Sequence, residues 1–167
     1  MSLIRRITFA CSLLAAASFA TADDDQRKHD NDKHGHHGDE HHSPFRGQPL
    51  LTLMHNMQYY GHKLGLSIDA GNAKLMGFYV HEVEEVIEAV SEIESYDGIA
   101  IPTLLDSTLK PKFEALEAAI EVGEQTRIDA AYNGLIEGCN GCHSSSGRPY
   151  IVIERNRENP YPQRFTP

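Results

Sequence analysis

The stretch Cys139-Asn140-Gly141-Cys142-His143 places two thiols three residues apart and an imidazole directly after the second thiol. In a helix, which turns by about 100° per residue, these three side chains leave one face within an arc of roughly 100°. The pattern C-x-x-C-H is the attachment sequence of a c-type haem, in which both thiols bond the macrocycle and the histidine ligates the iron. We therefore predict one covalent haem c, with Cys139 and Cys142 as thioether residues and His143 as the proximal iron ligand.

A helix carrying this motif is predicted over residues 124–144. Its apolar residues Ile128, Tyr132, Leu135 and Cys139 recur at spacings of four and three. That spacing gives one continuous apolar stripe, and the stripe leads into the motif. The apolar face of this helix is thus expected to be the haem face as well.

Three more amphipathic helices are predicted upstream, over residues 49–66, over residues 72–95 and within residues 103–122. Asn72 is a suitable cap for the second of them. Four such helices with short connections predict an all-α fold, an antiparallel four-helix bundle with the haem motif on the fourth helix. The bundle is assigned to residues 47–147.

Pro111 complicates the third helix, because an interior proline removes a hydrogen bond and clashes with the preceding turn. Two solutions are open. Either the helix begins near Lys110 with Pro111 in its first turn, or a short helix precedes a kink. Asp97-Gly98 predicts a turn before this segment, and Gly123 predicts its end.

The first 22 residues are predicted to be a secretory signal peptide. Arg5 and Arg6 precede an uncharged apolar run over residues 7–17, and Ala20-Thr21-Ala22 forms a small-residue cleavage site. The apolar run is too short to span a membrane. We therefore expect a periplasmic protein that does not span the membrane and keeps only two cysteines, Cys139 and Cys142.

Residues 23–46 are predicted to be a disordered, His-rich tail. The segment is almost wholly polar and contains six histidines, His29, His34, His36, His37, His41 and His42. Such a composition cannot bury a core. His-rich tracts can bind Cu, Zn or Ni, so a metal-binding module is one alternative to a merely solvated tail.

The last segment, residues 148–167, is predicted to be an extended arm. Prolines at positions 160, 162 and 167 preclude a helix there. Ile151, Ile153, Tyr161 and Phe165 are expected to pack the arm against the helices.

Other uses of a C-x-x-C pair fit this sequence less well. An exported protein could hold the pair as a disulfide, but His143 follows directly and favours haem. A structural zinc site needs four ligands, and the sequence has no second C-x-x-C. A thioredoxin-type site would need a βαβ context, which the predicted helices do not provide.

The net charge of the chain limits the classes of partner that it is expected to bind. The sequence has a formal net charge of −9, and loss of Arg5 and Arg6 with the signal peptide leaves 13 basic against 24 acidic residues, or −11. An acidic surface argues against nucleic acid, since phosphate contacts need Lys and Arg. No Ser/His/Asp arrangement or second cofactor motif is present, so we expect no enzyme but a carrier that meets periplasmic redox partners.

The chain resembles the cytochrome c′ and cytochrome b562-like class of four-helix-bundle haem proteins. The resemblance covers about residues 48–147, and it lies in the C-x-x-C-H of the last helix and in the helix order. Leu51-Thr52-Leu53-Met54 also looks like the first-helix stretch that covers the distal haem face in cytochromes c′. This resemblance implies that Leu51 forms the distal wall.

A closer group of exported haem proteins is similar around His62-Lys63-Leu64, Gly71-Asn72, the C-N-x-C-H form of the motif, Ile151-Val152-Ile153 and Asn159-Pro160. The chain departs from that group at Ala73, where we expect Trp. It departs from cytochromes c′ at Ser144-Ser145-Ser146-Gly147, which replaces a basic, aromatic helix end. Arg148 is then the candidate contact for a haem propionate.

The sixth iron position decides the function. A His or Met there predicts a single-electron carrier, whereas an empty position walled by Leu51 predicts binding of NO or CO. We predict His62 as the distal ligand or distal-pocket residue, with His55, Met54 and Met57 as alternatives. Single-electron transfer is the first hypothesis and cytochrome c′-like gas binding the second, and a homodimer is compatible with both.

Overall fold

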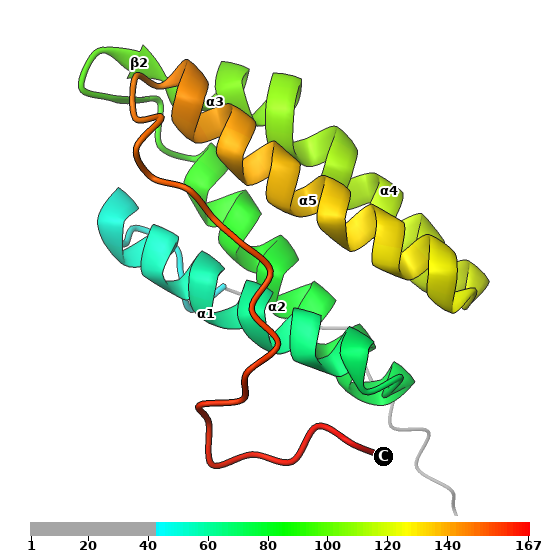
Figure 1. Ribbon diagram of the computed structural model, residues 1–167. Helices are drawn as coiled ribbons and strands as arrows, with labels where there is room; N and C mark the ends of the chain where they lie inside the picture. Colours follow the sequence, from blue (N-terminus) through cyan, green and yellow to red (C-terminus); the bar gives the residue numbers. More distant parts are fainter. Residues whose placement is uncertain (1–42) are drawn as a thin grey trace, which may run out of the picture. The chain divides into compact units, whose positions relative to one another are not determined.

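The computed structural model describes residues 43–167 (Figure 1). The predicted signal peptide and the six tail histidines lie outside the described residues. About two thirds of the described residues are helical, and the two strands have two residues each. The prediction of an all-α protein is therefore confirmed. No helix within residues 43–167 is long and apolar enough to cross a membrane.

The first two helices form an antiparallel pair. Helix α1 spans Leu50–Asp69 and helix α2 spans Ala73–Ser91. The Asn72 side chain accepts a hydrogen bond of 3.2 Å from the Leu75 N–H, as its cap position predicts. Gly71 supplies the positive φ of 63° that the tight connection requires.

A short hairpin follows α2. Strand β1 (Ser95–Tyr96) pairs antiparallel with β2 (Ile99–Ala100), and this ends α2 four residues before the predicted boundary. Asp97 and Gly98 both have positive φ, 51° and 77°, as expected for the tightest hairpin turns. The sequence predicts this turn but not the strands, because two residues are too few to display alternation.

The third predicted helix accommodates Pro111 by a change of helix type. A short α3 (Ile101–Leu104) continues into a π-helix, η1 (Leu105–Leu109), and then into α4 (Lys110–Val122). Pro111 lies in the first turn of α4, where a missing N–H costs least. Both predicted solutions are thus partly right, since a short helix does precede a helix that begins at Lys110.

Side-chain hydroxyls support this π-helical turn. Thr108 Oγ1 donates to the Leu104 carbonyl at 2.6 Å, and Ser107 Oγ donates to the Thr103 carbonyl at 2.8 Å. These hydrogen bonds tie the π-helical turn to the carbonyls of the turn before it.

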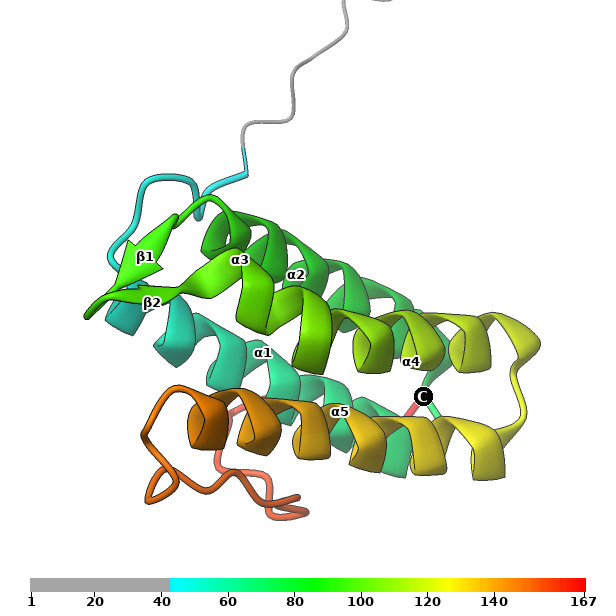
Figure 2. The ribbon, with the colours of Figure 1, turned by 90° about the horizontal axis from the view of Figure 1, so that it is seen from above.

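The last helix, α5, spans Gln125–Ser145, within one residue of its predicted bounds. It follows α4 directly, because Gly123 ends α4 in the left-handed conformation with φ 77°. Figures 1 and 2 show α5 running in the opposite direction to both α4 and α1. The helix contacts α4, η1 and α1.

Each of the four long helices contacts two others, in the order α1, α2, α4, α5 and back to α1. The predicted apolar stripes face the interior. The most deeply buried side chains are Leu53, Leu64, Ile68, Val83, Val86, Val90, Leu105, Leu116 and Ile128. This core fixes the helices that surround the candidate site.

Two glycines let α5 approach its neighbours closely. A Cβ at Gly65 of α1 would lie 2.4 Å from Tyr132 Oη, and a Cβ at Gly138 of α5 would lie 3.0 Å from the Thr108 carbonyl oxygen. Tyr132 also donates to the Gly61 carbonyl at 2.8 Å. The contact between Tyr132 and residues 61–65 therefore sets the register of α1 against α5.

The last residues of the predicted tail pack onto the helices. Residues 43–46, which the sequence assigned to the disordered tail, form a turn whose Phe45 is buried against Tyr60. Arg46 also pairs with Glu92 at 2.7 Å. The boundary at residue 46 is therefore wrong at these positions, because one apolar ring after a polar run is enough to bring the chain onto the core.

Residues 148–167 contain neither helix nor strand. This arm runs from the end of α5 along α1 and towards α2 (Figure 1). Phe165 is buried, and Asn72 Nδ2 donates to its carbonyl at 2.9 Å, while Ile153 and Tyr161 are half-buried. Ile151, which was expected to pack inward, is 40% exposed.

Gly65→Ala is expected to lower the free energy of unfolding by about 1–3 kcal/mol in urea denaturation, because the added methyl group meets the Tyr132 ring. Gly77→Ala is the matched control, since its Cβ would meet nothing within 4 Å. Alanine should stabilise α2 there by up to about 1 kcal/mol. Equal effects of both substitutions would contradict the close approach at Gly65.

Candidate functional site

One cavity of about 790 Å³ brings together every residue that the sequence predicted for the site. Its volume lies within the usual 300–1,000 Å³ of cofactor and ligand pockets, and its walls are mainly apolar. The predicted residues that line it are Leu51, Met54, His55, Met57, His62, Cys139, Cys142, His143 and Arg148. The helices α1 and α5 and the C-terminal arm form most of its wall.

The two motif cysteines are free thiols on the α5 side of the cavity. Burial, together with the neighbouring Cys142, raises the pKa of Cys139 to about 11. Burial also raises the pKa of Cys142. Reactive and redox-active cysteines typically have lowered pKa values, and burial shifts the pKa of both thiols here in the opposite direction.

The motif histidine is held in one tautomer. His143 Nδ1 lies 3.0 Å from the Ile151 carbonyl oxygen, which can only accept a hydrogen bond. Nδ1 therefore carries the proton, and Nε2 keeps the lone pair that a metal would take. Histidine ligands of metals commonly donate their other ring N–H in this way.

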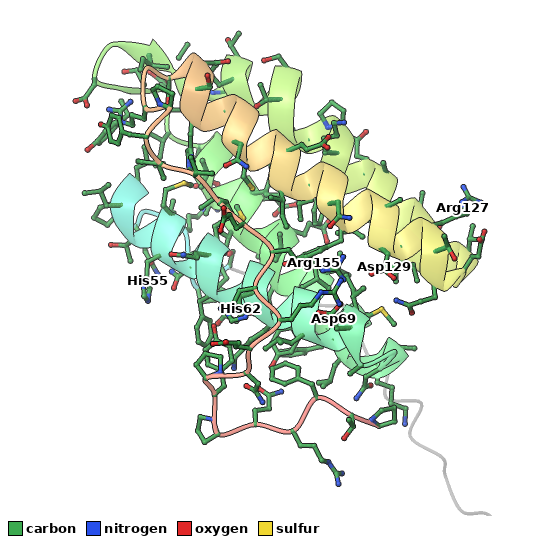
Figure 3. The ribbon with its side chains drawn as sticks, viewed as in Figure 1. His55, His62, Asp69, Arg127, Asp129 and Arg155 are labelled. Atoms are coloured by element: carbon green, nitrogen blue, oxygen red, sulfur yellow. The ribbon has the colours of Figure 1, made fainter. Side chains whose placement is uncertain are left out.

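His62, on α1, has a similar arrangement (Figure 3). Its Nδ1 lies 3.0 Å from Tyr161 Oη, whereas its Nε2 is buried and has no hydrogen-bond partner among residues 43–167. An unpartnered buried nitrogen in a cavity wall is costly unless a ligand or water meets it. This nitrogen therefore points to an occupant of the cavity.

The helix register separates His62 from the motif. Tyr132 meets α1 at Gly61, next to His62, but His143 lies eleven residues further along α5, or about 16 Å. Helical side chains lean towards the N-terminus, so in antiparallel helices these two imidazoles lean towards each other, but this closes only part of the gap. Both histidines line the same cavity, and the pairing of His62 with His143 on one iron stays a prediction.

The start of α1 lies opposite the motif instead. Because α1 and α5 are antiparallel, the residues before Gly61 approach the level of Cys139 and His143. There Leu51 is 70% exposed, Met54 is half-buried and His55 is exposed. Met54 and Met57, both half-buried, are thus the predicted thioether ligands in this part of the cavity wall.

Arg148 lies at the motif end of the cavity, as expected for a propionate contact. Its guanidinium pairs with Asp97 at 2.5 Å, donates to the Ser146 carbonyl at 2.9 Å and lies 5.4 Å from the Tyr96 ring centre. The hairpin turn therefore holds this positive charge in place. The propionate contact itself stays a prediction.

Arg155 anchors the arm between two helices (Figure 3). Its guanidinium pairs with Asp69 of α1 and, at 2.7 Å, with Asp129 of α5, and its side chain is only 12% exposed. It also donates to Asn133 at 3.1 Å. The hydrogen bond from Arg155 lowers the pKa of Asp129.

A cluster of aromatic rings holds the far part of the arm. Lys63 is buried with its Nζ 4.4 Å from the ring centre of Tyr59 and 4.9 Å from that of Tyr161, and it donates to Gln163 at 3.0 Å. Cation–π contacts of this kind are strongest where water is excluded. They fix the Tyr161 ring that reaches His62.

Sequence reasoning assigned no role to Asn140, Arg155 or the Tyr161 hydroxyl. Asn140 was visible as part of the motif, but its partner lies in the arm. No sequence pattern singled out Arg155, because a charged residue in a segment without periodicity is ordinarily predicted to be exposed to solvent. Within residues 43–167, no group of three or more His, Cys, Asp or Glu side chains is arranged to hold a metal ion.

Comparison of the chain with protein-family models, with curated proteins and with solved structures gave no match. The motif and the geometry of the cavity are therefore the features that bear on the function of this chain.

Arg155→Met is expected to lower the free energy of unfolding by about 2 kcal/mol at pH 7, because two carboxylates lose a charged hydrogen-bond partner. The lowered pKa of Asp129 gives stability that is present above pH about 4 and is lost as the pH falls through the folded-state value. The difference between wild type and variant should therefore shrink below pH about 4.

Arg157→Met is the control for this experiment. Arg157 also pairs with Asp69, at 2.6 Å, but its side chain is 65% exposed. Its loss should cost no more than about 1 kcal/mol. An equal cost for both arginines in the same pH series would show that Arg155 does not clamp the arm.

Proposed function

We propose that this chain is an exported c-type haem protein that carries single electrons. The observation that supports it most strongly is the arrangement of the motif around the cavity. Two free thiols and an imidazole with its Nδ1 proton held by Ile151 line one mainly apolar pocket. Cys139 and Cys142 would hold the haem by thioethers, and His143 would ligate the iron.

The fold proposed with this function is an antiparallel four-helix haem bundle of the cytochrome c′ and cytochrome b562 kind. The cyclic contacts of α1, α2, α4 and α5 support it. So does the cavity between α1 and α5, since bundles build their cofactor sites from side chains on facing helices. The opposite directions of α1 and α5 then bring the start of α1 over the motif (Figure 2).

The bound haem would supply an iron that changes its oxidation state by one electron. The protein residues hold and surround it. Cys139 and Cys142 fix the macrocycle on α5, Arg148 provides a positive charge at the motif end, and the apolar walls exclude water. Leu51 and Val152, 70% and 63% exposed, border the cavity and leave its rim accessible to a redox partner.

We place this activity outside the cytoplasm, where the predicted signal peptide would deliver the chain. The partners would be periplasmic redox proteins, and the net charge of −9 favours basic ones over nucleic acid. Met54 is the preferred sixth ligand, because it is half-buried in the cavity wall at the level of the motif. A Met ligand raises the potential relative to a second His.

A five-coordinate protein that binds NO or CO is the second candidate. The observation in its favour is the apolar character of α1 opposite the motif, where Leu51 and Met54 line the cavity. His62, one of the two histidines on α1, is hydrogen-bonded through Nδ1 to Tyr161 of the arm. An iron facing only Leu51 would keep its sixth position open.

A visible spectrum of the mature protein separates these functions. Covalent haem should survive extraction with acidified acetone and be lost in the Cys139→Ser, Cys142→Ser double variant. An electron carrier should give a low-spin ferrous spectrum that CO leaves unchanged. A high-spin ferrous spectrum that shifts with CO would contradict electron transfer and support gas binding. Absence of haem would overturn both proposals.

Met54→Ala is expected to convert the low-spin ferrous protein into one that is high-spin and binds CO, because the thioether leaves the sixth position. Met57→Ala and His62→Ala are the controls. Both residues also line the cavity, and neither substitution should change the spin state. A high-spin His62→Ala protein beside a low-spin Met54→Ala protein would restore His62 as the ligand.

A further inference from the structure

The motif residue Asn140 forms two hydrogen bonds with the backbone of Ile153 in the C-terminal arm, and we call this pair of bonds the clasp. Its Nδ2 donates to the Ile153 carbonyl at 2.9 Å, and its Oδ1 accepts from the Ile153 N–H at 2.7 Å. One side chain thus satisfies both backbone groups of Ile153, as a neighbouring strand would. The arm has no strand partner, so this clasp replaces the missing ladder.

The clasp lies two residues from the proximal histidine's hydrogen bond. Ile151 accepts from His143 Nδ1 at 3.0 Å, and Asn140 and His143 are three residues apart on α5. Residues at this spacing are neighbours on one helix face. The helix therefore holds the clasp and the imidazole in a fixed relation, and Val152 is the single residue between the two arm contacts.

Other contacts of the arm do not fix the Ile151 carbonyl as directly. The Ile151 N–H donates to the Arg148 carbonyl at 3.0 Å, which forms a turn after α5. Arg155 anchors the arm through a side chain, four residues beyond Ile151. Asn140 bonds both backbone groups of Ile153, two residues beyond the Ile151 carbonyl.

We propose that Asn140 is a positioning residue for His143: by clasping Ile153, it keeps the Ile151 carbonyl on His143 Nδ1 and thereby sets the tautomer and orientation of the imidazole. The effect on iron depends on the proposed function, whereas the tautomer does not. A hydrogen bond donated by its Nδ1–H makes an imidazole a stronger ligand to a metal through Nε2. The stronger donor favours the oxidised iron, so loss of the clasp should raise the reduction potential.

Asn133→Ala is the matched control for Asn140→Ala. Asn133 is also on α5 and also bonds the arm, through one hydrogen bond from Arg155 at 3.1 Å. A residue that merely anchors the arm should lower stability without changing the imidazole. Asn140→Ala should change the imidazole, and Asn133→Ala should not.

The first measurement uses the chain without haem. Nitrogen-15 NMR at pH about 8, where imidazole is neutral, reports which ring nitrogen of His143 is protonated. Wild type and Asn133→Ala should both show the Nδ1–H tautomer. Asn140→Ala should shift His143 towards the Nε2–H form that prevails for histidine in water, and an unchanged tautomer would overturn the proposal.

The second measurement uses the haem-loaded protein. The midpoint potential should rise in Asn140→Ala and stay at the wild-type value in Asn133→Ala. If wild type binds no haem while the tautomer still responds to Asn140→Ala, the proposed function fails and the positioning role stands. If wild type binds haem but Asn140→Ala changes neither tautomer nor potential, the positioning role alone fails.

Discussion

The contact of Tyr132 with Gly61 and Gly65 determines the geometry of the whole site. A side chain at position 65 would meet the tyrosine ring, so α1 and α5 can lie this close only because Gly65 has none. The hydrogen bond to Gly61 then fixes which turns of the two antiparallel helices face each other. It brings the first turns of α1, with Leu51 and Met54, towards the level of the motif and places His62 beside the Gly61 contact.

The C-terminal arm completes what the helices begin. It provides a carbonyl for His143 and a hydroxyl for His62, so one irregular segment supplies the Nδ1 partners of both histidines. Its position depends on few but directional contacts, chiefly the Asn140 clasp and the Arg155 ion pairs. A segment without secondary structure is thereby held in place, because Ile153, Arg155 and Arg157 each bond a side chain of α1 or α5.

Helix periodicity predicted the fold better than the fine structure. The bounds of α1, α2 and α5 agreed within four residues, and Gly123 and Asn72 had their expected roles. The π-helix before Pro111 and the two strands beside the predicted turn at Asp97 were not predicted, since each involves only a few residues that carry no periodic signal. The sequence predicted the motif residues and the candidate ligands on α1, all of which line one cavity. It did not predict how far along α1 each candidate sixth ligand lies from the motif.

Residue types and their spacing are enough to specify the reactive groups of this chain, which are two thiols and an imidazole on one helix face, together with four apolar stripes and an acidic net charge. These are local properties, which depend on residue type and spacing along one segment. Which side chains meet across the cavity depends on how the helices pack, because the register of two helices is set by a close approach such as that at Gly65. The same holds for Asn140, whose partner Ile153 is thirteen residues away and is reached only when the arm folds back onto α5.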